Sequence, residues 1–243
     1  MKPSFATRAL LLLLVPAVYA QNNTLSPKEK AAGWRLLWDG NSMHGWHSAK
    51  GADVPVDGAE IKDGVLHLRS SESHQGDVVS DDIFGDFELT VDFKLTRGAN
   101  SGVKYFVNDK VNEAAKSVIG FEYQLLDDDV HPDAKLGRNG DRKTASLYDI
   151  LPAAENQPTR PIGEWNTARI VVRGNHAEHW LNGVKVLEYD RTSPTFREAL
   201  AQSKFKDFKG FGDASDGHIL LQDHGDVVYF RNIKIRPLTA HSK

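Results

Sequence analysis

The run Phe121–Asp127 carries the side chains with the clearest potential for chemistry, because its polar and apolar residues alternate. In a β-strand, the apolar positions would share one face and point into a core. Glu122 and Gln124 would then project together from the other face. A carboxylate beside an amide suits a hydroxyl-rich ligand such as a sugar, and it could also supply a general base. The alternative is a solvated strand face without a chemical role.

Two other strand patterns would present polar side chains from a similar surface. Lys104 lies between Val103 and Tyr105. Leu220, Gln222 and His224 would form a similar outward set, with Ile219 and Leu221 pointing inward. An outward lysine could stabilise negative charge that develops on a reacting oxygen. A histidine can donate or accept a proton near neutral pH. The alternatives are an exposed strand lysine and a histidine with purely structural hydrogen bonds.

The longest irregular stretch, from Asp127 to about Ala145, is a candidate functional loop, because loops of this length in compact domains are usually functional. Its carboxylates and His131 could hold a divalent cation, but the glycine and the distal glutamate of a calcium loop are missing. We therefore expect a polar lid or a solvated loop, with no metal and no cofactor. Tyr148 and Asp149, which follow the loop, are candidate ligand contacts.

Trp46 lies in a polar, glycine-flanked segment and is the tryptophan best placed to stack on a sugar ring. Several catalytic motifs are absent, including a phosphate-binding glycine loop, a nucleophile elbow and His-Glu-x-x-His. The Glu-x-Asp-x-x-Glu pattern of retaining glucanases is absent too. No second carboxylate is an obvious partner for Glu122, although ordinary glycoside hydrolysis needs two.

Strand patterns dominate the elements that must position these residues. Residues 87–95 alternate strictly between apolar and polar. Asn-Gly at 182–183 and Asp-Gly at 63–64 are typical of type I′ hairpin turns. The spacing of apolar residues near Asn232 predicts a β-bulge. Only residues 194–204 have a convincing helix start. These patterns predict an all-β protein, a sandwich of two antiparallel sheets with little helix.

The composition is that of an ordinary globular protein. The chain has 243 residues, 40% of them hydrophobic, and a formal net charge of -3. This charge gives no basic excess for nucleic acid. The absence of cysteine excludes disulfides, thiolate metal sites and cysteine nucleophiles.

The N-terminal residues predict export. Residues 1–20 combine a basic start, a short apolar stretch and small residues before a cleavage position, as signal peptides do. We expect residues 21–32 to form a flexible leader and residues 33–238 to form a single domain. The mature protein is expected in a periplasm or outside the cell, without membrane attachment. Its oligomeric state is open.

Eight short motifs follow one another in order along nearly the whole mature chain. They are Gly33–Gly40 with Gly45 and Trp46, Gly98–Gly102, Phe121–Asp127, Ser146–Asp149, Gly163–Asn166, His179–Gly183, Leu221–Gly225 and Phe230–Ile233. In this order the sequence resembles the 3-keto-disaccharide hydrolase domain, a family also described as 3-keto-glucoside lyase and 3-keto-2-hydroxy-glucal hydratase. The resemblance implies a concanavalin A-like jelly-roll sandwich whose concave face binds an oligosaccharide or glycoside.

The resemblance also implies a reaction. A ketone at sugar C3 acidifies the proton on C2, so one base can remove it, the C1 substituent leaves, and water adds to the resulting glucal. We assign Glu122 as the base, Lys104 as the group that stabilises the enolate and His224 as the proton donor, with the roles of Glu122 and His224 exchangeable. The residues expected to position the sugar are Trp46, Asn100, Gln124, Asp127, Tyr148, Asp149, Gln222 and Arg231.

Two other functions fit the same pattern. A non-catalytic carbohydrate-binding module would present similar polar side chains from a sheet. A conventional glucanase would use the same sandwich, but the missing carboxylate pattern disfavours it.

Overall fold

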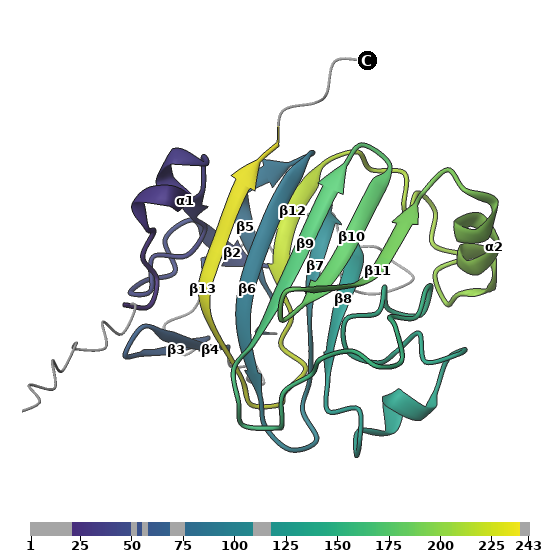
Figure 1. Cartoon of the computed structure of the whole chain (residues 1–243), viewed down its shortest axis with the longest axis horizontal. Helices are drawn as coiled ribbons and strands as arrows, with labels where there is room; N and C mark the ends of the chain where they lie inside the picture. Colours follow the sequence, from purple (N-terminus) through teal and green to yellow (C-terminus); the bar gives the residue numbers. More distant parts are fainter. Residues whose placement is uncertain (1–20, 50–52, 55–57, 69–75, 109–117, 239–243) are drawn as a thin grey trace, which may run out of the picture.

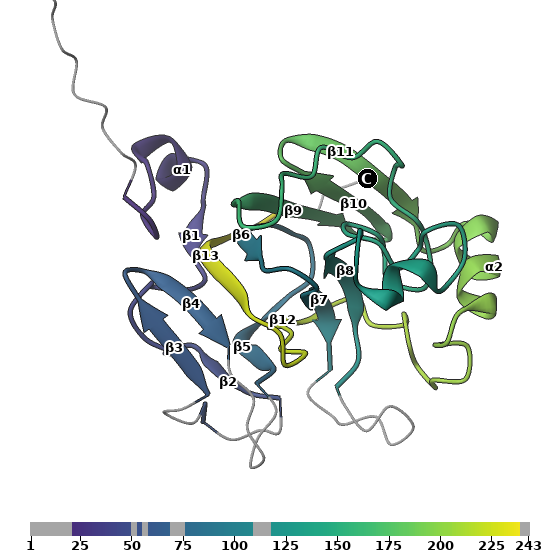
Figure 2. The same ribbon diagram turned by 90° about the horizontal axis from the view of Figure 1, so that it is seen from below.

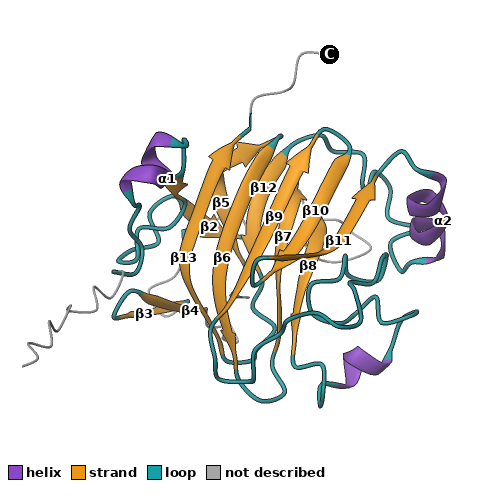
Figure 3. Cartoon of the chain, in the orientation of Figure 1, coloured by secondary structure: helices purple, strands orange, loops and turns teal. Residues whose placement is uncertain are grey.

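The computed structural model describes residues 21–49, 53–54, 58–68, 76–108 and 118–238. The strands of this part of the chain form two antiparallel sheets. The larger sheet has the order β11-β10-β9-β6-β13-β4-β3, and β1 also pairs with β13 (Figures 1 and 3). Its strands are β1 Arg35–Leu36, β3 Ala59–Lys62, β4 Val65–Leu68, β6 Phe87–Leu95, β9 Asn166–Arg173, β10 His176–Leu181, β11 Val184–Asp190 and β13 Val228–Pro237. The smaller sheet has the order β2-β5-β12-β7-β8. Its strands are β2 Trp46–Ser48, β5 Val78–Phe84, β7 Asn100–Val107, β8 Phe121–Leu126 and β12 Gly217–Leu221.

Helical structure is limited to short segments at the margins of the sheets (Figure 3). These are α1 Pro27–Ala31, α2 Pro194–Gln202 and a 3-10 turn Pro132–Lys135. Ser193 caps α2, and Pro194 occupies its first turn, as the sequence predicts. The fold is therefore the predicted concanavalin A-like sandwich of two antiparallel sheets. None of the described helices is long and apolar enough to cross a membrane.

The core lies between the two sheets, which Figure 2 shows as separate layers. The apolar residues of β6 face those of β7, β8 and β12 in one cluster. Phe121, Tyr123 and Leu125 of β8 are at most 2% exposed. Burying each such side chain is worth about 1.5–3 kcal/mol, and a one-residue slip of β8 would turn all of them outward. The core thereby fixes the direction of Glu122 and Gln124, which point from the outer face of the smaller sheet.

The turns that the sequence predicts are present. Asn182 and Gly183 have φ of 49° and 85°, and Asp63 and Gly64 have 53° and 70°, which a type I′ turn requires. The register between β6 and β13 shifts around Asn232, whose φ is 51°. The hairpins predicted at 63–64 and 182–183 and the predicted bulge are thus confirmed.

The segment 21–32 differs from the expected flexible leader, because its polar side chains are fastened to the sandwich. The backbone N–H of Asn23 donates to Asn232 Oδ1 at 2.6 Å, and the side-chain amide of Asn23 donates to the carbonyl oxygen of Gly64 at 2.8 Å. Lys234 donates to Glu29 at 2.7 Å, which holds the pKa of Glu29 at about 2. The predicted export signal, residues 1–20, lies outside the described residues.

A chain of buried hydrogen bonds crosses the core between the two sheets. His179 Nδ1 lies 2.8 Å from the carbonyl oxygen of Ala145, and its Nε2 lies 2.9 Å from the hydroxyl of Tyr105. Since a carbonyl can only accept, Nδ1 carries the proton, and a neutral His179 then accepts from Tyr105. The hydroxyl of Tyr189, 2.5 Å away, donates to Tyr105 in turn. Burial lowers the pKa of His179 to about 4.

We expect this histidine to make stability depend on pH. Between pH 6.5 and 4 the unfolded chain binds a proton at His179 that the folded chain excludes, so stability falls as pH falls through this window. The loss should total about 3 kcal/mol, since each unit of pKa difference is worth about 1.36 kcal/mol. Denaturant unfolding at pH 7 and pH 4 measures it. A His179→Gln variant, which cannot titrate, should lose less stability over this window; an equal loss in both proteins would contradict the assignment.

Candidate active site

A cavity of about 270 Å³ opens on the outer face of the smaller sheet. Its lining comes from β7, β8, the residues that follow β12 and three other loop segments, and it consists of Asn100, Lys104, Val118, Ile119, Gly120, Glu122, Gln124, Tyr148, Lys204, Phe205, Phe208, Gln222 and His224. We call it the polar cavity. The three residues predicted to be catalytic all line it, and so do the predicted contacts Asn100, Gln124, Tyr148 and Gln222.

The sheet brings Lys104 and Glu122 together. These two residues are directly paired between β7 and β8, and Lys104 Nζ lies 4.0 Å from Glu122 Oε2. Lys104 is 9% exposed and Glu122 is 8% exposed. Gly102 leaves room for the carboxyl group, because a Cβ there would lie 2.7 Å from Glu122 Oε1. The result is an enclosed carboxylate held beside an ammonium group.

The charge balance around Glu122 suits a base that works near neutral pH. Burial raises the pKa of Glu122, while Lys104 and, to a smaller extent, Lys204 lower it. Asp77, which precedes β5, raises it slightly. Asp77 does not line the polar cavity, and its Oδ1 accepts a hydrogen bond from the backbone of Asp223. Among the described lining residues, Glu122 is therefore the only carboxylate.

Buried amides next to this pair provide unsatisfied acceptors. Asn100 Oδ1 and Gln222 Oε1 have no hydrogen-bond partner among the described residues. Gln124, which is 1% exposed, uses its own Oε1 to accept from the backbone of Leu125 at 3.1 Å. An unpaired buried acceptor costs about 1–3 kcal/mol. Hydroxyl groups of a ligand would satisfy Asn100 and Gln222, which gives this end of the cavity the chemistry of a sugar subsite.

One wall of the cavity comes from the segment after α2, and the sequence analysis missed it. Lys204, Phe205 and Phe208 lie there, outside any strand pattern. Lys204 Nζ lies 4.2 Å from the centre of the Tyr148 ring. Partial desolvation lowers the pKa of Lys204, although the residue as a whole is exposed. The wall therefore adds a second ammonium group to the cavity.

Two carboxylates, Asp133 in the long loop and Asp149 just after it, hold this wall in place. Asp149 accepts from Arg142 Nε and from the backbone N–H of Lys204, both at 2.6 Å. Asp133 accepts from Arg142 Nη1 and from the hydroxyl of Tyr148, both at 2.8 Å. Asp149, predicted to contact the sugar, thus lies outside the cavity lining and positions Lys204 instead. Many residues of the irregular loop are exposed, as a solvated loop requires, and Asp133 and Arg142 within it also support Tyr148 and Asp149.

Comparison with known proteins shows the family to which the chain belongs. The model of the 3-keto-alpha-glucoside-1,2-lyase-like domain matches residues 33–236. The chain belongs to this family. The matched residues include both sheets and every residue that lines the polar cavity.

Relatives of this lyase-like domain agree with the match. A 3-keto-disaccharide hydrolase of Bacteroides thetaiotaomicron is 34% identical, over 90% of this chain and 83% of the relative. A crystal structure of a putative glycosyl hydrolase from Parabacteroides distasonis superposes with a TM-score of 0.80 at 31% identity, covering 90% of this chain and all of that one. A second such structure gives a TM-score of 0.63 at 28% identity, covering 84% and 99%. Together they support a carbohydrate-active, glycoside-cleaving enzyme.

Three predicted sugar contacts of this lyase-like domain lie away from the cavity. Trp46 does not line the cavity, and its buried indole N–H donates to the carbonyl of Leu37. Asp127 accepts from the backbone of Gly98 at 2.7 Å and fastens a turn. Arg231 belongs to the other sheet, where its guanidinium lies 4.0 Å from the centre of the Trp165 ring. Their contacts stabilise the fold instead.

Carboxylate clusters outside the cavity also have structural partners. Asp128 in the long loop accepts from the backbone N–H of Thr144 at 2.8 Å. His176, Glu178 and Glu188 come close enough together on β10 and β11 to suggest a metal site. Lys185 already forms ion pairs with both of these glutamates, so a protein group offsets part of their charge.

Proposed function

We propose that the protein cleaves 3-keto-glycosides, first by elimination across C1 and C2 and then by hydration of the glucal. The observation that carries this proposal is the single carboxylate of the polar cavity, Glu122, enclosed beside the ammonium group of Lys104. One base and one oxyanion stabiliser are what an elimination next to a ketone needs. The family membership and the 3-keto-disaccharide hydrolase relative support the same reaction.

In the first stage Glu122 takes the proton from C2. The electron pair of that C–H bond forms a C2–C3 double bond, and the C3 carbonyl becomes an enolate oxygen, whose charge Lys104 stabilises. Lys204 adds a second positive charge from the opposite wall. When the carbonyl forms again, a C1–C2 double bond appears and the bond from C1 to the leaving oxygen breaks. His224, which lines the cavity, protonates that oxygen.

In the second stage water adds to C1 of the unsaturated ketone. His224, now neutral, accepts the proton of the water, and Glu122 returns its proton to C2. The products are the free 3-keto sugar and the leaving alcohol, so the net reaction is hydrolysis without a glycosyl-enzyme intermediate. Asn100, Gln222 and Gln124 are placed to hold the hydroxyl groups of the sugar.

Each alternative function makes a different demand on the cavity. A conventional glucanase needs two carboxyl groups on either side of the scissile bond, about 5–9.5 Å apart, but only Glu122 lines the described cavity. A binding module needs the amides and aromatic rings. It does not need a buried carboxylate with a raised pKa beside a lysine, an arrangement that is concentrated at catalytic sites.

We expect the purified protein to cleave a 3-keto-disaccharide and to leave the non-oxidised parent disaccharide intact. Only the keto sugar has the acidic C2 proton on which elimination depends. Chromatography of both incubations measures the outcome, with heat-denatured protein as the control. Cleavage of both sugars would establish a glucanase instead, and binding of either sugar without cleavage would establish a binding module.

We also propose that the protein works outside the cytoplasm. The support is the basic start, the apolar stretch and the small residues before a cleavage position in residues 1–20. Fractionation of cells that produce the full chain tests this, and a product that stays in the cytoplasm with residues 1–20 attached would contradict it.

A further inference from the structure

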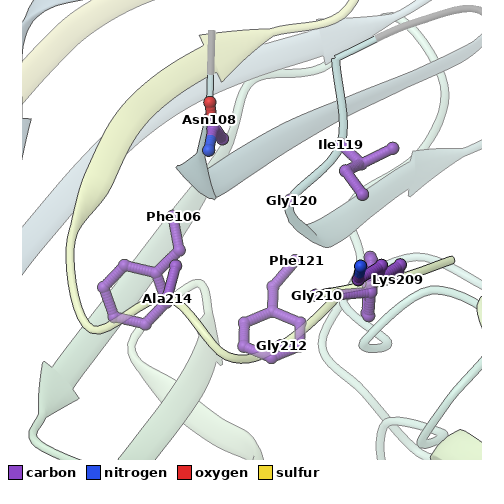
Figure 4. A pocket seen from close by; sticks show the side chains of 10 residues that line it. Phe106, Asn108, Ile119, Gly120, Phe121, Lys209, Gly210, Gly212 and Ala214 are labelled. Carbon is purple, nitrogen blue, oxygen red and sulfur yellow. The ribbon is translucent and has the colours of Figure 1, made fainter. Parts of the chain in front are cut away.

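A second cavity, of about 240 Å³, adjoins the polar cavity. It is formed by the end of β7, the start of β8 and the segment before β12, and its lining is Phe106, Asn108, Ile119, Gly120, Phe121, Lys209, Gly210, Phe211, Gly212 and Ala214. We call it the aromatic cavity. In the view of Figure 4, Phe106 and Phe121 lie on one side of it, and Asn108 and Ile119 lie on the other.

The two cavities are continuous along one surface. Ile119 and Gly120 line both of them. Phe205 of the polar cavity and Phe211 of the aromatic cavity stack face to face, with ring centres 4.2 Å apart. A ligand could therefore extend from one cavity into the other along a shared wall.

Glu122, the proposed base, lies between the two ends of this surface. Gln124 and Glu122 occupy alternate positions of β8, and Gly120 lies two residues before Glu122, just ahead of the strand. At about 3.3 Å per residue, Gln124 and Gly120 are separated by about 13 Å, enough for two ring-sized groups. Gly120 has no side chain to divide them, and a Cβ there would lie 2.7 Å from the carbonyl oxygen of Tyr105. A sugar held at Gln124 would thus direct its C1 substituent past Glu122 toward the aromatic cavity.

The lining indicates which substituent fits. The described residues of the aromatic cavity include no carboxylate, and three of them are phenylalanines. Lys209 and Asn108 supply its polar groups. The polar cavity also has three aromatic rings, from Tyr148, Phe205 and Phe208, but it adds a carboxylate and three side-chain amides. A planar apolar ring with a polar substituent suits the aromatic cavity better than a second sugar does.

We propose that the aromatic cavity is the subsite for the leaving group and that it takes an aryl group, so that aryl 3-keto-glycosides are substrates. This inference rests on the proposed function for the direction of cleavage. A phenol also leaves more easily than an aliphatic alcohol, because it ionises near a pKa of about 10. The bond that breaks is the one between C1 and the phenolic oxygen, as in the elimination described above.

Binding of non-oxidised glucosides tests the subsite without any turnover. In isothermal titration, 4-nitrophenyl glucosides of both anomers are compared with the matching methyl glucosides. We expect the wild-type protein to bind at least one nitrophenyl anomer about tenfold more tightly than its methyl counterpart, because the phenyl ring is buried. Ala214→Leu, which fills the aromatic cavity, should abolish this preference. Asn108→Trp, which narrows the cavity from an exposed position, should reduce it.

The matched control is Ala201→Leu, an exposed position on α2 that lines neither cavity. It should keep the tenfold preference, and melting curves identify any variant that does not fold. Equal affinities for nitrophenyl and methyl glucosides in the wild type, or an unchanged preference in the two cavity variants, would overturn the inference. Because no bond is broken in this experiment, its result is independent of whether 3-keto-glycosides are cleaved.

Discussion

Replacing Glu122 by Gln is expected to lower kcat for a 3-keto-glucoside by about 10²–10⁴-fold, the usual contribution of a general base. Gln keeps the shape and the hydrogen-bonding reach of the side chain but cannot accept the C2 proton, so KM should change much less than kcat. Steady-state kinetics on a 3-keto-glucoside measure the effect. Near wild-type turnover would remove Glu122 from the mechanism.

A matched control separates chemistry from stability. Glu88 is another strand carboxylate with little exposure, at 4%, but it lies on the other sheet and pairs with Arg169 and Arg236. Glu88→Gln should lower the melting temperature and leave kcat unchanged. Exchange of the C2 hydrogen with deuterium from the solvent identifies the base. If Glu122 and His224 exchange roles, this exchange would survive Glu122→Gln and disappear in His224→Gln.

Replacing Lys104 by Met is expected to lower kcat/KM by about 10²–10³-fold, the range for loss of one group that stabilises an oxyanion. The variant should also change the pH profile. Lys104 is the main group that lowers the raised pKa of Glu122, so its removal lets burial raise that pKa further. The acid limb of kcat/KM should then move to higher pH, since Glu122 must be deprotonated to act.

Lys104→Arg provides the rescue, because it restores a positive charge beside Glu122. We expect it to return the acid limb toward its wild-type position and to recover part of the activity. Equal losses in the Met and Arg variants, with the acid limb unmoved in both, would mean that Lys104 only supports the sheet. Melting curves of both variants are needed, because removing one partner of a buried ion pair also destabilises the protein.

The part of the site that lies on strands was predictable from the sequence. Alternation along 121–126 places Glu122 and Gln124 on one face, because the apolar residues between them must reach the core. The same argument places Lys104 on the outer face. The pairing of β7 with β8, which brings Lys104 beside Glu122, was not indicated by any predicted hairpin turn. Period-two patterning is strong evidence wherever one face of a strand is buried.

The wall of the polar cavity could not be predicted in this way. Lys204 and Phe205 follow a helix in a segment without periodicity. Their position depends on a hydrogen bond between Asp149 and the backbone of Lys204, which joins residues 55 positions apart. A single sequence carries no local sign of such a contact. For the same reason Asp149 was predicted to contact the sugar, although it holds the wall instead. Trp46 was misplaced because its polar sequence neighbours conceal its hydrogen bond to Leu37.

The chemistry of the enzyme and its choice of substrate depend on different parts of the fold. The groups proposed to break bonds lie on or beside the strands of the smaller sheet, where the core behind them allows little change. The walls that meet the rest of the substrate come largely from the segment between α2 and β12, residues 203–216, which contributes to both cavities. Sequence change in that one segment can therefore alter which glycosides are accepted while the reaction stays the same. Substrate range and chemistry can diverge at different rates within one domain.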